Sequence, residues 1–346
     1  MKRWLFALVA LLFACSSHAE IKSYEKRVAY SKTVHKRLAA RDLQSLDNEA
    51  AAFQKSQDRT ADGRWKLTLF FRSVSVVMAQ LVQDDAKWPS FEKRLLAFAE
   101  RETRSQHAWL IYAEALNAKA WHVRGRGFSG TTTAEGRAQY RQIMSQARDA
   151  LDSHKPQLSP NPHWYAQRIQ LGSYLGESTE NLMALFKEGI AKEPTYYPTY
   201  YSALFSLTPR WGGSERKMLA FIDSTRGIAP EGTSLYARLF LFLHEESEDG
   251  IRDLDGVDWK LMEASMLAIL KRYPDDWNSQ GFLMMACMKG DMALVRRVVN
   301  EVKEPASPER LGRNLELFEM CRDVARGKME GFIMNDPKTG KQVFMK

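Results

Sequence analysis

The chain has 346 residues, of which 27% are charged and 45% hydrophobic, and its formal net charge is +8. This composition is ordinary for a soluble globular protein. The basic excess is spread along the chain without a block of five like charges, so the sequence predicts no nucleic-acid partner.

The first twenty residues have the pattern of a secretory signal peptide. Lys2 and Arg3 precede an apolar run at 4–14 that is too short to span a bilayer, and small residues follow it. Cleavage after Ala19 would remove residues 1–19. Cleavage after residue 14 is the alternative, because residues 12–15 resemble the lipobox of bacterial lipoproteins and would leave a lipidated Cys15. We therefore predict that the protein is exported, either to the periplasm or as a membrane-anchored lipoprotein. It would contact the membrane only through the lipid on Cys15.

Helix signals follow one another from residue 42 to residue 327. Apolar residues recur at helical spacing over 64–82, 88–104 and 107–123, and capping residues precede many such segments. The expected helix starts are Asp42, Thr132 (a capping box with Glu135), Asn161, Ser214, Asp258, Asp291 and Ser307. The expected helix ends are Gly176, Pro194, Pro274, Gly290 and Gly327.

These segments predict an all-α protein of roughly fourteen to fifteen helices joined by short connections. Antiparallel helix pairs repeating every 34 to 40 residues or so are typical of a tetratricopeptide-like α-solenoid. We assign residues 20–327 to one helical-repeat domain. The tail at 328–346 differs, because two short apolar segments flank a turn at 336–340, and this pattern favours a short β-hairpin.

Three segments, AWHVRGRG at 120–127, LTPRWGGS at 207–214 and ACMKGD at 286–291, resemble a bacterial family known as domain of unknown function 4034. The similarity would extend over about residues 40–305. It implies a helical, tetratricopeptide-like fold. It implies no activity and no functional residues, because none is assigned to that family.

Two groups of residues are candidates for binding a partner. Arg124 and Arg126, close to Trp121, could bind a carboxylate or phosphate as a bidentate clamp. Alternatively, their positive charges could only stabilise the negative C-terminal end of a helix dipole. Trp211 could line a groove together with three tyrosines, Tyr197, Tyr200 and Tyr201. The alternative for this second group is a tight turn with an N-cap and aromatic rings packed between helices.

Catalytic and metal-binding patterns are not convincing. The seven histidines lack the spacing of metal ligands, and we predict no cofactor. Patterns of the type S-x-x-K, S-x-N and K-T-G occur at residues 23, 159 and 338, in the order found in penicillin-binding enzymes. The helical context lacks the sheet that such an enzyme needs, so a hydrolase is only a distant alternative.

Two cysteines, Cys287 and Cys321, lie beyond the predicted signal peptide, and both are on predicted helices. They could pair in an oxidising compartment, but we expect two small buried apolar residues instead. The sequence as a whole predicts a non-catalytic scaffold that binds a protein partner in the cell envelope. A binder of cell-wall glycan or peptide is the alternative.

Overall fold

The computed structural model describes residues 23–125, 132–228, 233–246, 256–306, 308–335 and 341–346. The predicted cleavage sites and Cys15 lie outside these ranges. The first half contains α1 (Ser23–Ala39), α2 (Leu43–Ser56), α3 (Lys66–Leu81), α4 (Trp88–Arg101), α5 (Ala108–Arg124), α6 (Ala134–Ser153), α7 (Lys155–Leu158), α8 (Pro162–Leu175) and α9 (Thr179–Lys192).

The second half continues with α10 (Tyr197–Ser206), the 3₁₀ turn η2 (Pro209–Trp211), α11 (Glu215–Ser224), α12 (Ser234–Glu246), α13 (Trp259–Arg272), α14 (Asp276–Lys289), α15 (Met292–Val298), η3 (Val299–Glu301), α16 (Pro308–Leu311), η4 (Gly312–Asn314) and α17 (Leu315–Ala325). Two strands, β1 (Phe332–Asn335) and β2 (Gln342–Met345), complete the chain. The all-α helical-repeat fold is thus confirmed.

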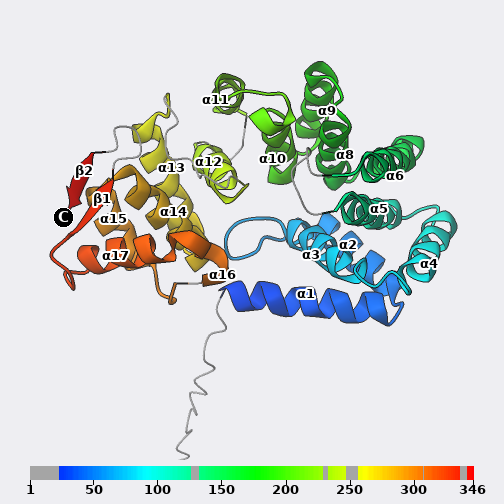
Figure 1. Cartoon of the computed structure of the whole chain (residues 1–346), viewed down its shortest axis with the longest axis horizontal. Coiled ribbons are helices and arrows are strands. Elements are labelled where there is room, and N and C mark those ends of the chain that lie inside the picture. The colour runs from blue at the N-terminus through cyan, green and yellow to red at the C-terminus, as the bar shows by residue number, and fades with distance from the viewer. Residues whose placement is uncertain (1–22, 126–131, 229–232, 247–255, 307, 336–340) are drawn as a thin grey trace, which may run out of the picture.

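Successive helices pack side by side, and the row of helices curves back toward its own beginning (Figure 1). The first helix, α1, runs along one edge of the molecule and packs on α2 and α3, while its early residues reach α14. Helix α1 was not predicted from the sequence, because most of its residues are polar. Only two of its described residues, Val34 and Leu38, are buried apolar side chains of the core. In the described part of the chain, no helix is long and apolar enough to cross a membrane.

Local capping signals are mostly confirmed. Side-chain oxygens of Asp42, Asn161, Ser214, Asp258 and Asp291 each accept a main-chain N–H at the start of α2, α8, α11, α13 and α15. Such a bond satisfies one of the amides that a helix start leaves unpaired.

Two predicted helix boundaries were wrong. The cap of α6 is Thr133, whose hydroxyl accepts the Gly136 amide, rather than Thr132. The last helix is also not continuous, since α16 ends before a 3₁₀ turn that begins at Gly312, whose φ is +52°. A residue in this left-handed region cannot continue a right-handed helix, so α17 starts anew at Leu315. Ser307 lies outside the described residues.

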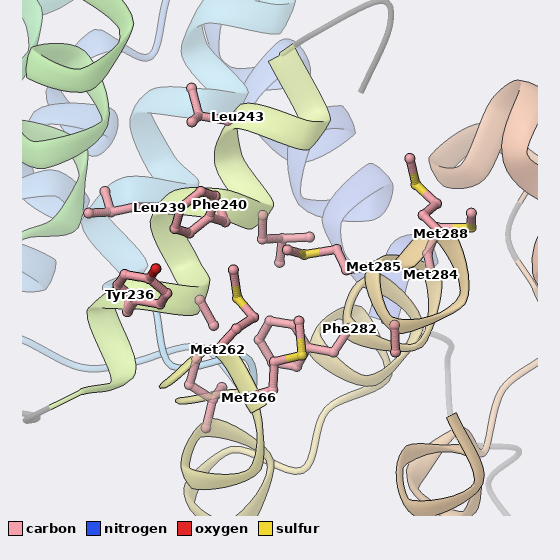
Figure 2. Close-up of a cluster of buried hydrophobic side chains, with 14 of the residues drawn as sticks. Tyr236, Leu239, Phe240, Leu243, Met262, Met266, Phe282, Met284, Met285 and Met288 are labelled. Carbon is pink, nitrogen blue, oxygen red and sulfur yellow. The ribbon is translucent and has the colours of Figure 1, made fainter. Parts of the chain in front are cut away.

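The interior is divided into two hydrophobic cores of different composition. The N-terminal core, built from residues between Val34 and Tyr196, contains the buried indoles of Trp65, Trp88, Trp109 and Trp164. The C-terminal core, built from residues between Ile169 and Met345, is rich in methionine where α12, α13 and α14 meet (Figure 2). Its buried methionines are Met218, Met262, Met266, Met284, Met285, Met288, Met292 and Met345.

The two cysteines form a disulfide, so our expectation of two unpaired apolar residues was wrong. Helices α14 and α17 pack side by side and bring the Cα atoms of Cys287 and Cys321 to 6.0 Å, within the range that a disulfide requires. Both side chains are fully buried in the C-terminal core.

The predicted C-terminal hairpin is confirmed. Strands β1 and β2 are antiparallel, with Phe332 opposite Met345 and Ile333 opposite Phe344. Phe332 and Met345 are buried and fasten one face of the hairpin to the C-terminal core. The turn at 336–340 lies outside the described residues.

Candidate functional site

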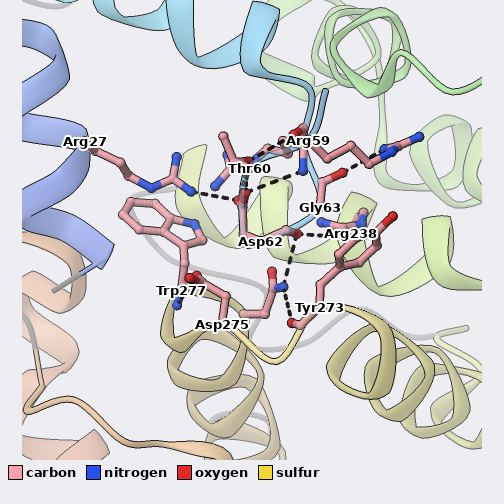
Figure 3. Close-up of polar contacts among 11 residues, drawn as sticks. Arg27, Arg59, Thr60, Asp62, Gly63, Arg238, Tyr273, Asp275 and Trp277 are labelled. Carbon is pink, nitrogen blue, oxygen red and sulfur yellow. Dashed lines mark hydrogen bonds and ion pairs between the residues drawn. The ribbon is translucent and has the colours of Figure 1, made fainter. Parts of the chain in front are cut away.

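The connection between α2 and α3, residues 57–65, turns back sharply at the centre of the molecule (Figure 1), and its polar contacts are shown in Figure 3. The Thr60 amide donates to the Arg64 carbonyl at 2.7 Å, and the Gly63 amide donates to the Thr60 carbonyl at 2.8 Å. Gly63 has φ +89°, and a Cβ there would come within 2.5 Å of the Tyr273 ring. Both the backbone conformation and the lack of space therefore require glycine at this position.

Asp62, at the tip of this turn, is buried and holds two arginines. Its carboxylate pairs with Arg27 of α1 at 2.8 Å and with the side chain of Arg64, and it also accepts the Thr60 hydroxyl. Burial by itself would raise the pKa of Asp62. The charges of Arg64 and Arg27 outweigh burial and hold this pKa well below its usual value.

The main chain at Asp62 joins the turn to the second half of the molecule. The Asp62 carbonyl accepts Arg238 of α12 at 2.9 Å and Asn278 of α14 at 3.1 Å, across 176 and 216 positions of sequence. The Arg27 guanidinium lies 4.2 Å above the Trp277 ring of α14. We call Arg27, Asp62, Arg64, Arg238 and Asn278 the central cluster, and its bonds run from α1 and the turn to α12 and α14.

The three candidate tyrosines do not form an exposed binding groove. Tyr197 is buried, with Arg238 at 5.2 Å from its ring, and Tyr200 is buried with its hydroxyl donating to the Pro194 carbonyl at 3.1 Å. Tyr201 is partly exposed, and its ring stacks on Phe242 of α12 at 4.8 Å. The alternative interpretation, aromatic rings packed between helices, describes Tyr197 and Tyr200 correctly, and their surface role was wrong.

Trp121 and Trp211, ninety positions apart, meet instead at one partly exposed ring. The Tyr174 ring, near the end of α8, lies 5.3 Å from Trp121 and 5.1 Å from Trp211. Tyr140 of α6 extends this contact at 5.0 Å from Trp121, and Phe205 of α10 extends it at 5.7 Å from Trp211. We call these five side chains the aromatic row.

An arginine covers each tryptophan of the aromatic row. The Arg124 guanidinium lies 5.1 Å from the Trp121 ring, and the Arg210 guanidinium lies 5.5 Å from the Trp211 ring. Burial raises the pKa of Tyr140, and the opposing charges are those of Arg124, Arg210 and Arg141. The charges that act on this end of the row are therefore positive.

Two polar groups in the row are buried without a hydrogen-bond partner in the described part of the chain, the Tyr140 hydroxyl and the Trp211 indole N–H. A buried donor left in this state costs about 1–3 kcal/mol.

The turn after α10 places Trp211 in the row. Gly212 has φ +81°, and a Cβ at Gly213 would overlap the main-chain carbonyl of Leu207. Ser214 then caps α11 by accepting the Lys217 amide at 3.2 Å. The predicted tight turn with an N-cap is thus present, and it leaves Trp211 partly exposed beside Tyr174.

Of the predicted site residues, Trp121, Arg124 and Trp211 come together, while Arg126 lies outside the described residues. Tyr174, Tyr140 and Phe205 were missed because each lies in its own helix, without a local motif. The central cluster was missed as well. The Asp62-Gly63 pair between two helical segments is a turn signal that could have drawn attention to it.

A Ser–His–Asp grouping occurs at the start of α5. Ser105 donates its hydroxyl to Asp47 and accepts the amides of His107 and Ala108, and His107 Nδ1 lies 3.4 Å from Asp47. In a hydrolase triad the imidazole lies between the serine and the carboxylate. Here the serine binds the carboxylate directly and caps the helix. Among the described residues, no three His, Cys, Asp or Glu side chains are placed to hold a metal ion.

Comparison of the chain with protein-family models and with curated proteins, and of the structure with solved structures, finds no match. The resemblance to the domain of unknown function 4034 family therefore stays a prediction from the three segments.

Proposed function

We infer that this protein is an exported, non-catalytic helical-repeat scaffold that binds a protein partner in the cell envelope through the aromatic row. The observation that carries this proposal is the meeting of Trp121 and Trp211 at Tyr174, with Arg124 and Arg210 over the two indoles. Aromatic and arginine side chains dominate the energetics of protein interfaces.

The charges indicate the chemistry of that partner. Arg124 and Arg210 lie over the two indoles, and together with Arg141 they also act on Tyr140. A segment with acidic side chains would pair with these guanidinium groups. We therefore expect an acidic segment with an apolar or aromatic residue at its centre.

Cell-wall glycan is the second candidate, because Trp121 and Trp211 are both partly exposed. Sugar rings bind tryptophan by stacking on its flat face. In the aromatic row the rings around Trp121 meet edge to face, and Arg124 and Arg210 lie over the indoles. Since a sugar would have to displace these arginines, the geometry favours a protein partner.

Export rests on the N-terminal pattern of the sequence and gains support from the disulfide. Cys287 and Cys321 are paired and fully buried. Structural disulfides form and persist in oxidising compartments such as the bacterial periplasm. Whether the chain carries a lipid at Cys15 or begins at Glu20 is decided by mass spectrometry of the mature N-terminus.

The proposal is tested by crosslinking the mature protein in its native envelope fraction and identifying what it captures. We compare wild type with Arg210→Glu, which inverts an exposed charge of the row, and with Trp211→Ala. The matched control is Arg104→Glu, an exposed arginine just before the start of α5, whereas the row lies at the end of that helix, about 25 Å away.

We expect one protein recovered in near-stoichiometric amount with wild type and with Arg104→Glu, and at least tenfold less with the two row variants. Equal recovery with folded row variants would show that the row is not the binding site. Binding to purified peptidoglycan that Trp211→Ala abolishes would favour the glycan alternative instead.

A further inference from the structure

The C-terminal hairpin of β1 and β2 lies at the opposite end of the molecule from α5 and α6 (Figure 1), and it presents an apolar surface. Six large hydrophobic side chains are exposed in the described part of the chain. Four of them lie in the hairpin or just before it: Met329, Ile333, Val343 and Phe344. Ile333 and Phe344 are the most exposed of all, at 62% and 60%. Such clustering is informative, whereas single exposed apolar residues are ordinary.

The register of the hairpin explains why this surface exists. Ile333 and Phe344 are directly opposite each other, so their side chains lie on the same face. The neighbouring pair, Phe332 and Met345, lies on the other face and is buried in the C-terminal core. One face thus anchors the hairpin, and Val343, which is opposite Met334, belongs to that face and is exposed only in part. The other face carries Ile333 and Phe344 and points away from the core.

Exposed basic residues lie close to this apolar face in sequence. Lys328 precedes Met329, Lys341 precedes β2, and Lys346 follows it, and all three are exposed. Among the described residues from 326 onward, Glu330 is the exposed acidic side chain. The surface therefore combines exposed aliphatic and aromatic groups with nearby positive charges.

We propose that this hairpin face, formed by Ile333 and Phe344 with the exposed Met329 just before β1 and with Lys328, Lys341 and Lys346 close in sequence, binds the surface of an anionic phospholipid bilayer. The apolar side chains would enter the boundary between headgroups and acyl chains, and the ammonium groups would lie at the level of the lipid phosphates. Each lysine near an anionic surface strengthens binding roughly fivefold.

Two other occupants fit less well. A second copy of the chain would bring like charges from both copies together, and this repulsion opposes self-association. A stable protein interface buries about 800 Å² on each partner. The exposed apolar side chains of a two-stranded hairpin offer far less than that, whereas weak, reversible membrane binding requires only a few inserted groups and nearby basic residues.

The test is sedimentation of the chain, in the form that begins at Glu20, with vesicles of phosphatidylcholine containing increasing phosphatidylglycerol. This form carries neither a signal peptide nor an acyl group. The variants are Ile333→Thr and Phe344→Thr, in which a β-branched polar residue keeps the strand preference, and the charge variant Lys341→Glu combined with Lys346→Glu. The matched control is Val76→Thr, which removes an exposed hydrophobe from α3.

We expect binding that rises with phosphatidylglycerol content and falls with salt, because the attraction is screened. Phe344→Thr should weaken the partition coefficient about tenfold, the double charge variant should weaken it by a similar factor, and Val76→Thr should leave it unchanged. Absence of binding at any phosphatidylglycerol content would overturn the proposal. So would binding that survives both hairpin substitutions, because that would be a general attraction of a basic chain.

Discussion

The two cores of this protein stabilise the same helical-repeat fold with different side chains. The N-terminal core is built around four buried tryptophans, and the C-terminal core around eight buried methionines and a disulfide. Indole rings are large and rigid and bury much area with few rotatable bonds. Methionine is flexible and fills irregular gaps, so it specifies a single arrangement less strongly. The comparison teaches that the core built from the more flexible side chains is the one that carries a covalent link.

The central cluster is where these two halves join, and its loss should have the largest effect. Asp62→Ala leaves Arg27 and Arg64 at their places without the carboxylate that both contact. Breaking a buried ion pair from one side typically costs about 3–5 kcal/mol. We expect a loss of that size in the free energy of unfolding, measured by urea denaturation.

The control for this substitution is Asp58→Ala, which removes the exposed pair with Lys66 in the same turn. An exposed pair contributes about 0–1 kcal/mol. If Asp62→Ala costs no more than Asp58→Ala, the central cluster does not hold the halves together.

The difference between the cores themselves is tested by one aromatic-to-alanine substitution in each. Trp164 is fully buried, and its N–H donates to the Leu151 carbonyl at 3.1 Å. Trp164→Ala should cost about 3–5 kcal/mol. Phe282→Ala, at an equally buried position among the methionines (Figure 2), should cost less, because flexible methionine side chains can move into the space that is left. Thermal and urea unfolding of both variants provide the measurement. Equal costs would mean that the two cores are equally demanding of shape.

Reduction of the disulfide should affect one half of the molecule. The bond closes a loop between positions 34 apart, and a loop of this size contributes about 2–4 kcal/mol in the chain-entropy model. We expect Cys287→Ala combined with Cys321→Ala to raise amide hydrogen exchange in α14, α15 and α17 and to leave α3, α5 and α8 unchanged. A uniform rise over the whole chain would indicate that both cores unfold as one unit.

The smallest expected effect concerns a buried carboxyl group in the N-terminal core. Burial raises the pKa of Glu114 in α5 to about 7, although its hydrogen bonds, including that from Gln167 at 3.0 Å, oppose this shift. The folded state therefore holds a proton that the unfolded chain releases above its ordinary pKa near 4.5. The contribution of Glu114 is fully present below about pH 4.5 and is lost as the pH rises toward 7.

Glu114→Gln removes this titration and keeps the shape of the side chain. We expect the variant to gain about 1–3 kcal/mol relative to wild type between pH 5 and pH 8, from urea denaturation at both values. A constant difference between the two proteins at both pH values would contradict the raised pKa.

What could be predicted from the sequence was local. Asp42, Asn161 and Ser214 cap helices because each cap depends on a side chain and an amide two or three residues away. The hairpin at the end of the chain follows from the same short-range logic. Gly312 is the instructive failure, since a single left-handed residue divided a segment that otherwise has helical spacing.

What only the tertiary structure decided was the environment of each side chain. Tyr197 and Trp211 look equally available in the sequence, yet the packing of α10 buries one and leaves the other beside Tyr174. In the sequence Asp62 is part of an ordinary polar turn, and only the fold brings α1, α12 and α14 into contact with it. Burial, charge pairing and the disulfide depend on residues brought from distant parts of the chain, and spacing along one segment carries no information about them.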